Sequence, residues 1–453
     1  MQPTINVKHG NENLVSQSGL LPVGALLESI KFGERFDNLP GVHCVDPKIS
    51  HGDILSSMVG LICVGKPDYS AIEYYRQDPF FFTQSLGVQK CPSQSTLRER
   101  IDLIGTSANE MIKRASVEMI REKAPAISPI QTSAGSFIPL DMDVSPFDNS
   151  KTKKEGVSRT YKGCDGYAPM LGYLGTEGYL INVELRKGSQ HCQKDTPGFI
   201  EDILKLTRQI TQEPLLIRLD SGNDSQDNFE VIMKWDDVDV LVKRNLRKES
   251  LDGWLFLAQN AEHVKVIRCP HKSVWVGQTA VGLKGQTLPR PIVFKVTERY
   301  ESKGVPLLFA EIEVETYWCT VAGLSPQEVI NLYHDHGTSE QFHSEIKSDL
   351  GLERFPSCHF DSNSLILHLS LLGYNILRII GQTSLEEQNG VDLPKNRKKK
   401  VSRRRLKSVM QDLIYMAGRL IHSGRQWFIS FGKVNPFSKL ADNVLQRLRC
   451  SPG

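Results

Sequence analysis

The stretch EPLLIRLDSG, residues 213–222, decides how this chain is interpreted. A short apolar run followed by Ser-Gly is typical of a buried strand. Asp220 ends the run, and in α/β sheets the carboxyl ends of strands face the crevice that holds ligands. An acid at this point therefore indicates a functional site at a sheet edge.

A second strand carries acids in the same setting, in SFIPLDMDVS, residues 136–145. Alternate residues of a strand share a face, so Asp141 and Asp143 lie on one face, opposite the apolar residues. Two acids on an otherwise apolar strand are costly unless a partner or ligand compensates their burial.

A third acid comes from YHDHGTSEQFHSEIK, residues 333–347, in a long helix predicted to begin at Ser325-Pro326 and to continue through Gly337 at some cost. Four polar side chains share one stripe of this helix at the 3.6-residue period: Tyr333, His336, Glu340 and Lys347. Glu345 lies roughly 140° around the helix from Glu340 and is the poorer candidate.

Converging carboxylates predict a cation. If Asp143, Asp220 and Glu340 met, each pair would repel by ~3 kcal/mol at an effective dielectric near 20. Oxygen ligands favour Mg²⁺ or Mn²⁺. Two such ions, ~3.5–4 Å apart, would activate a water or a 3′-hydroxyl for phosphodiester chemistry. Taken singly, each acid is more often a turn residue or a salt-bridge partner.

The remaining chain divides by pattern. Residues 1 to about 130 are predicted as helices, and residues from 134 as strands and helices of a mixed α/β layer. Residues 247–320 are predicted to be β-rich, with WLFLAQN (254–260) as one strand. CPSQSTLRERID (91–102) is similar to the second helix of a helix-turn-helix, with Ser93 or Ser95 as N-cap, although many helical domains contain such a segment.

Composition bounds the class. A net charge of +3 does not by itself indicate a nucleic-acid partner, but the run RKKKVSRRRLK, residues 397–407, is strongly basic. The nine cysteines form no CxxC pair and are expected to be reduced thiols of a cytosolic protein. The N-terminus has no apolar signal core, and the apolar stretch 364–380 is expected to be a buried helix.

These motifs resemble those of DDE transposases from bacterial insertion sequences, whose signature is Y-x2-R-x3-E-x6-K. Tyr333, Glu340 and Lys347 match it, and His336 stands where Arg is usual. LDMDVS and RLDSG resemble the strands that carry the first and second Asp. Further stretches resemble the insertion-sequence 1380 family: INVELRKGSQHC (181–192), CPSQSTLRERID and FDSNSLILHLSLLGYNIL (360–377). The resemblance covers roughly residues 80–430.

The resemblance implies an α/β protein with a ribonuclease H-like catalytic core and a β-rich insertion. A mainly helical N-terminal DNA-binding region would precede the core, and a helical C-terminal region would follow it. The implied boundaries are 1–130 for the N-terminal region, 131–246 and 321–384 for the core, 247–320 for the insertion, and 385–453 for a basic loop and the C-terminal helices.

The resemblance also implies the site. Asp143, Asp220 and Glu340 would be the catalytic triad and hold two Mg²⁺ or Mn²⁺ ions, with Asp143 preferred over Asp141 because the family often has Asp-x-Thr there. DNA contacts are expected from eight residues: Tyr333, His336, Lys347, Arg98, Arg100, Arg403, Arg404 and Arg405. His336 would clamp phosphate less well than Arg. Trp254 and Trp275 would pack in the insertion or stack on an unpaired base.

The expected protein is a transposase of the bacterial cytoplasm and nucleoid, without a membrane partner. It would bind the terminal inverted repeats of its element as a homodimer on paired ends, hydrolyse the 3′ ends and join them to target DNA. Two alternatives stay open: a nuclease of the same fold that cannot join strands, and an inactive transposase-derived DNA-binding protein. A glycosidase with two carboxylates would not explain the basic segments.

Overall fold

The computed structural model describes residues 5, 7–37, 39–42, 44, 47–281, 290–394 and 401–450. The chain forms two compact units. We call Ala126–Ser344 the central unit, and Met1–Pro125 together with Glu345–Gly453 the terminal unit. The finer domain boundaries expected from the sequence stay predictions.

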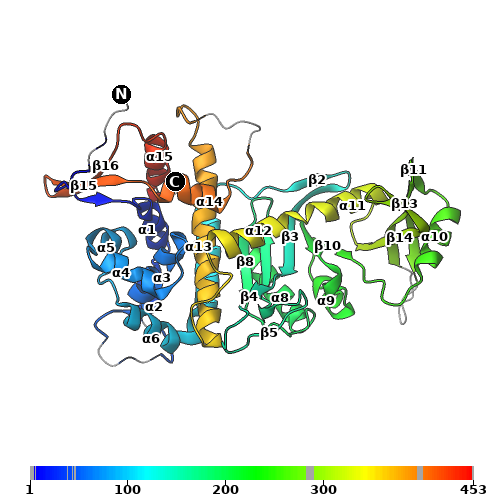
Figure 1. Ribbon diagram of the computed structural model, residues 1–453, viewed down its shortest axis with the longest axis horizontal. Helices are drawn as coiled ribbons and strands as arrows, with labels where there is room; N and C mark the ends of the chain where they lie inside the picture. The colour runs from blue at the N-terminus through cyan, green and yellow to red at the C-terminus, as the bar shows by residue number, and fades with distance from the viewer. Residues whose placement is uncertain are drawn as a thin grey trace. The chain divides into compact units, whose positions relative to one another are not determined.

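The central unit is built on a mixed sheet that has ten strands within the described residues (Figure 1). Its order is β11-β12-β13-β14-β10-β9-β3-β7-β8, and β2 pairs with β3. The bounds are β2 (Ile130–Thr132), β3 (Gly135–Val144), β7 (Met170–Leu174), β8 (Tyr179–Glu184), β9 (Leu215–Leu219), β10 (Val238–Lys243), β11 (Lys265–Cys269), β12 (Lys272–Val281), β13 (Arg290–Ser302) and β14 (Val305–Cys319). The predicted mixed α/β layer is confirmed.

Strand register brings the two acidic stretches together. β3 pairs with β9 in parallel and with β7 antiparallel, and β9 pairs with β10 in parallel. The last β3–β9 partners are Met142 and Leu219. Asp143 and Asp220 therefore follow directly, at the carboxyl ends of two neighbouring strands.

Helices cover the sheet and fix these strand ends. They are α8 (Thr196–Thr207), α9 (Gln226–Ile232), α10 (Leu251–Asn260), α11 (Pro326–Asp335) and α12 (Thr338–Ser344). α11 begins where the sequence predicts, with a capping box between Ser325 and Glu328. Its apolar face packs on Leu216 and Leu241 of the sheet, through Val329 and Leu332 among others.

Two predicted elements differ from the structure. WLFLAQN is not a strand but part of α10, because the Ser250 side chain caps the helix at Gly253 N and Trp254 and Ala258 bury one face at i,i+4 spacing. The long predicted helix is also broken, since α11 ends at Asp335 and α12 begins at Thr338. The other described residues of 247–320 are β-rich, and β14 joins them to the main sheet beside β10.

A second, small sheet lies between β3 and β7 in sequence. It has the order β4-β6-β5, from β4 (Phe147–Asp148), β5 (Ser158–Arg159) and β6 (Asp165–Tyr167). Since β3 ends at Val144, this sheet starts just beyond Asp143.

The terminal unit is mostly helical (Figure 1). Its helices are α1 (Leu20–Ser29), α2 (Phe32–Asp37), α3 (His51–Cys63), α4 (Ile72–Arg76), α5 (Phe80–Leu86), α6 (Gln94–Ile104), α7 (Asn109–Lys123), α13 (Phe360–Glu386), α14 (Leu406–Val409) and α15 (Ser438–Arg449). A small sheet has the order β1-β15-β16, from β1 (Leu14–Val15), β15 (Gly418–Ser423) and β16 (Gln426–Phe431). A π-helical turn covers Glu345–Asp349.

α13 contains the apolar stretch expected to be a buried helix. By length and composition alone it could cross a membrane, but core helices share both properties, and its most apolar window is wholly buried in the protein. α3, α6 and α7 pack against it within the terminal unit.

Candidate active site

Asp220 follows β9 and sits in a tight turn. All of Leu215–Leu219 is buried, so the turn begins from a rigid base. Asn223 Nδ2 donates to Asp220 Oδ1 at 2.7 Å. A Cβ on Gly222 would lie 3.3 Å from both carboxylate oxygens of Asp220 and 3.0 Å from Cys192 Sγ. The glycine of RLDSG therefore leaves room for the carboxylate.

Asp143 lies at the end of β3 with its carboxylate partly exposed. The Val144 amide donates to Asp143 Oδ1 at 2.7 Å, and Oδ2 lies 3.3 Å from His343 Nε2. The Tyr173 hydroxyl is 3.0 Å from His343 Nδ1. A neutral imidazole satisfies both contacts when Nε2 donates to Asp143 and Nδ1 accepts from Tyr173.

The two carboxylates influence each other. Burial, followed by the charge of Asp143, raises the pKa of Asp220. Burial also raises the pKa of two phenols, Tyr333 and Tyr161, with further increases from both Asp143 and Asp220. Both aspartates therefore face the same small space, where a cation would relieve their repulsion.

Asp141, two residues before Asp143, is occupied by partners. It is 2% exposed, and Arg218 binds both its oxygens, from Nε at 2.6 Å and Nη2 at 2.7 Å. His336 Nδ1 lies 3.0 Å from Asp141 Oδ1. Burial acts to raise the pKa of Asp141, but Arg218 and His336 outweigh it and lower that pKa to about 2. Asp141 is thus a buried ion-pair residue, whereas Asp143 is open to a ligand.

His336 does not have the exposed position expected for a phosphate contact. It is buried and holds Asp141, while Arg218 Nη1 donates to the Leu332 carbonyl at 2.9 Å. Together these contacts pin the end of α11 to β3 and β9. Tyr333 is thereby kept beside the aspartates, with its ring 5.0 Å from that of Tyr317.

Glu340 is exposed on α12, and the structure does not bring it to the two aspartates. Among the residues that the structure describes, no group of three or more His, Cys, Asp and Glu side chains is placed to hold a metal ion. The chain tightens between the helices, where Gly337, Ser339 and Glu340 donate to carbonyls three residues back. Bonds of this kind form a 3₁₀ turn, which holds about 3.0 residues instead of the 3.6 of an α-helix. Over four residues, the side chains are therefore rotated by roughly 80° from the directions that a continuous α-helix would give them. The predicted stripe therefore does not continue across Gly337.

His343 reaches Asp143 from the helix that carries Glu340. Sequence reasoning missed it because its position depends on the phase of α12, which the 3.6-residue stripe misjudged. The only available signal was its spacing of three from Glu340, which places both on neighbouring positions of one helix face.

The acid judged the poorer candidate, Glu345, is buried in the terminal unit. Arg378 binds its carboxylate, and Arg403 Nη1 lies 2.9 Å from Oε1. Lys347 belongs to the same π-helical turn and is partly buried. Glu345 thus acts as the anchor of a buried charge cluster.

The arginines predicted from the basic run are engaged within the terminal unit. Arg403 binds Glu345, Arg404 binds Asp412, and Arg405 binds Asp349 from Nε and Nη2, both at 2.9 Å. These ion pairs engage all three guanidinium groups within the terminal unit, and the DNA contacts expected from them stay predictions. Residues 397–400 of the run lie outside the described residues.

The helix-turn-helix arginines differ from each other. Ser93 caps α6, accepting from Thr96 N at 3.2 Å, as expected. Arg98 is exposed on α6. Arg100 is 7% exposed, and its guanidinium donates to the Ile49 carbonyl and contacts His51. Arg100 therefore supports the fold here and does not present its charge to a phosphate.

Trp254 and Trp275 are both buried in the β-rich segment. Trp254 packs near Phe294 and donates from Nε1 to Glu249 at 2.9 Å. The structure supports core packing, the first of the two roles considered for them.

The donor set at the strand ends fits Mg²⁺ or Mn²⁺. Mg²⁺ is commonly held by one or two carboxylates together with waters and substrate phosphates. Within the described ranges, the side-chain partners of Asp143 and Asp220 are His343 and Asn223 and include no Lys or Arg, and the mutual repulsion of the two carboxylates favours a cation between them.

Of the comparisons with known proteins, the family model alone identifies a family. No curated protein sequence matches the chain. Among solved structures, the chain is similar to a piggyBac transposase in a cryo-EM synaptic complex with hairpin DNA, at 9% identity and a TM-score of 0.41, over 96% of this chain and 82% of that chain. The family described as "Transposase DDE domain group 1" matches residues 1–452. The chain therefore belongs to the transposase DDE domain group 1 family.

Proposed function

We propose that this protein is the transposase of a bacterial insertion sequence of the 1380 family, and that it cleaves the terminal inverted repeats and joins the ends to target DNA. One observation carries the proposal. Asp143 and Asp220 meet at neighbouring strand ends, and among the described residues neither pairs with a Lys or Arg side chain, while Asp141 beside them is paired with Arg218.

The proposed core is ribonuclease H-like. Counted in chain order, the first five long strands of the central unit, β3, β7, β8, β9 and β10, lie as third-second-first-fourth-fifth in the sheet. The first and fourth of them end at Asp143 and Asp220. This matches the expected placement of the first Asp on the first strand and the second Asp after the fourth.

Asp143 and Asp220 would hold Mg²⁺ or Mn²⁺, as two ions. Bound there, the metal would supply Lewis-acid stabilisation of the phosphodiester and an activated attacking oxygen. Glu340 remains the proposed third carboxylate, one helical turn from His343. For Glu340 to join Asp143 and Asp220, α12 would have to turn, because His343 is now the residue of this helix that contacts Asp143.

The reaction proceeds in two transfers. In the first, a water oxygen bonds to phosphorus at the transposon end, the P–O3′ bond breaks, and the products are a 3′-hydroxyl and a 5′-phosphate. In the second, that 3′-hydroxyl attacks a target phosphorus and releases a target 3′-hydroxyl. Asp143 and Asp220 would hold the metal to which the reacting phosphate binds, and the Tyr333 phenol lies near both aspartates.

DNA is the proposed partner, as transposon ends and as target, with a homodimer on paired ends. Proteins that act on DNA gain much of their affinity from phosphate contacts. Lys347 and Arg98 remain candidates for these contacts, and both stay predictions.

The test is cleavage by Asp220→Asn of a 5′-labelled duplex that carries the inverted repeat flanking the coding region. We expect a loss of at least about 10³-fold in cleavage with end binding retained, because the amide cannot supply a charged ligand. Glu213→Gln, at the other end of β9, is the matched control.

Three outcomes separate the alternatives. Cleavage by Asp220→Asn near the wild-type rate would contradict the assignment. Wild-type cleavage without strand transfer into a plasmid would favour the nuclease. Wild-type end binding without metal-dependent cleavage would favour an inactive DNA-binding protein.

A further inference from the structure

Residues 145–169 connect β3 to β7, and we call them the connecting segment. The segment leaves the site directly, because β3 ends one residue after Asp143. It contains the small sheet β4-β6-β5 and returns as β7, which pairs with β3 and places Leu171 opposite Asp143. Both ends of the connecting segment are therefore fixed beside Asp143.

Tyr161, in the turn between β5 and β6, stands at the edge of the site. Its hydroxyl donates to the Val144 carbonyl at 3.2 Å, one residue from Asp143. The residue is nevertheless 67% exposed. Burial of the phenol, then the charges of Asp143 and Asp220, raise the pKa of Tyr161. The hydroxyl thus lies at the Asp143 end of β3, while the residue as a whole is largely open to solvent.

The loop of the connecting segment is held rigidly from inside. Asn149 is fully buried, and its Oδ1 accepts from Lys154 Nζ at 3.2 Å. The Tyr167 hydroxyl donates to the Glu155 carbonyl at 2.7 Å, and Thr152 Oγ1 donates to the Asn149 carbonyl at 2.7 Å. A surface that is already ordered loses little entropy when it binds a ligand.

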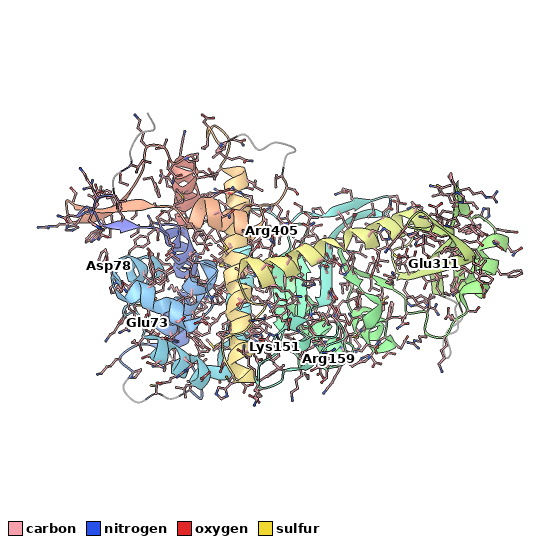
Figure 2. All side chains as sticks on the ribbon, viewed as in Figure 1. Glu73, Asp78, Lys151, Arg159, Glu311 and Arg405 are labelled. Carbon is pink, nitrogen blue, oxygen red and sulfur yellow. The ribbon has the colours of Figure 1, made fainter. Side chains whose placement is uncertain are left out.

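The outer surface of the connecting segment is basic. Four cationic side chains are exposed on it, Lys151, Lys153, Arg159 and Lys162, against two exposed acidic ones, Glu155 and Asp165. Figure 2 marks Lys151 and Arg159 on this segment. Arg159 Nη1 lies 3.5 Å from Asp165 Oδ1, and both side chains are more than half exposed. An exposed pair of this length contributes little, so a phosphate can displace it.

The geometry points to a DNA-binding surface: we propose that the connecting segment binds the backbone of the strand being cleaved, with Arg159 and Lys162 on its phosphates. The Tyr161 ring packs against the nucleotide beside the reacting phosphodiester. This inference rests on the proposed function, and it names residues that the sequence signature does not include. The proposed ligand is transposon-end DNA, because the connecting segment adjoins Asp143 itself.

The binding test compares Arg159→Gln/Lys162→Gln with wild type, by fluorescence anisotropy of a labelled 30-base-pair duplex from the DNA that flanks the coding region. Each lost phosphate contact lowers the slope of log affinity against log salt by about 0.9, so the double variant should lose about 2. We also expect about tenfold weaker binding at moderate salt.

Lys205→Gln/Lys234→Gln is the matched control. It makes the same change in charge on α8 and just after α9, ahead of the amino ends of β9 and β10 and so away from the aspartates. Its salt slope should equal that of wild type. An unchanged slope in Arg159→Gln/Lys162→Gln, or an equal loss in the control, would overturn the inference.

Tyr161 is tested by two substitutions assayed for cleavage of the same duplex. Tyr161→Phe keeps the ring and should cleave within about threefold of wild type, whereas Tyr161→Ala should raise KM about tenfold with a smaller change in kcat. Equal KM values for Tyr161→Ala and wild type would contradict the proposed ring contact.

Separate measurements keep this inference apart from the proposed function. Failure of the wild type to cleave would reject the enzyme assignment, while the salt slopes would still decide whether the connecting segment binds DNA. Strand transfer from pre-cleaved ends into a plasmid tests whether the connecting segment binds target DNA instead of the transposon end. A defect of Arg159→Gln/Lys162→Gln confined to that step would assign the surface to target DNA and overturn the inference.

Discussion

Asp141 and Asp143 lie two residues apart on the same face of β3, yet their surroundings differ completely. Asp141 is buried against Arg218 and His336, and its pKa falls to about 2. Asp143 meets a backbone amide and one imidazole, and its charge raises the pKa of Asp220. The first acid is satisfied within the fold, and the second is left for a ligand.

The neighbouring strand and helix therefore determine which of the two acids is paired within the fold and which is open to a ligand. Arg218 interrupts the apolar run of β9 and pairs with Asp141 across the β3–β9 register. Asp143 and Asp220 directly follow Met142 and Leu219, the last partners in that register. The ion pair thus lies beneath the site, where it holds both strands and the end of α11.

The largest expected effect on stability comes from Asp141→Asn. The substitution leaves Arg218 buried without its counter-ion, which should cost about 3–5 kcal/mol in the free energy of unfolding. Asp143→Asn, at a half-open position, should cost less than about 1 kcal/mol. Urea unfolding of both variants checks the contrast, and equal losses would break the distinction between the two acids.

The stabilisation that the Asp141 carboxylate contributes depends on pH. The pKa of Asp141 lies below its ordinary value of 3.8, so its stabilisation is present above pH 3.8 and is lost as the pH falls towards 2. The stability difference between wild type and Asp141→Asn should shrink over that range. A constant difference would show that the ion pair is not its source.

The next effect concerns His343, which positions Asp143. Removing it in His343→Ala frees the carboxylate to rotate, and loss of a residue that orients a metal ligand typically weakens metal affinity by about 10–100-fold. We expect the Mg²⁺ concentration for half-maximal cleavage to rise by about tenfold or more, with a smaller change in kcat at saturating metal. His334→Ala, at an exposed position on α11, is the control, and identical Mg²⁺ curves would contradict the role.

The smallest expected effect is a stabilisation by Asp220→Asn. The pKa of Asp220 is raised, so its contribution to stability is complete below pH 3.8 and is lost as the pH rises through its folded-state value. The neutral amide should therefore raise the free energy of unfolding of the metal-free protein at pH 7.5 by on the order of 1 kcal/mol or less. The melting temperature should rise accordingly at pH 7.5 and stay unchanged at low pH. A lower melting temperature at pH 7.5 would contradict the proposed repulsion.

Much of the central unit could be predicted from the sequence. The apolar runs before Asp143 and Asp220 specify buried strands, and Ser325 with Glu328 specifies the start of α11. These features are local, so spacing and caps suffice to identify them. The preference for Asp143 over Asp141 came from the family resemblance, and the structure supplies a physical reason in Arg218 and His336.

The rest depends on contacts that spacing does not encode. The tightened turn at Gly337 changes the phase of α12, which turns Glu340 outward and brings His343 to Asp143. Arg403 and Arg405 of the basic run are engaged because Glu345 and Asp349, more than 50 residues away, accept them. Only the fold shows that Tyr161 returns to the Asp143 end of β3.

The central claim is that Asp143 and Asp220 together form the divalent-metal site for DNA cleavage. The most direct measurement is a Mn²⁺ titration of the complex with the end duplex, with free Mn²⁺ followed by electron paramagnetic resonance. We expect Asp143→Asn/Asp220→Asn to bind Mn²⁺ at least about tenfold more weakly than wild type. The control Glu201→Gln/Glu230→Gln, with the same loss of charge on α8 and α9, should bind Mn²⁺ as wild type does. Equal Mn²⁺ affinity in Asp143→Asn/Asp220→Asn and wild type would contradict the central claim.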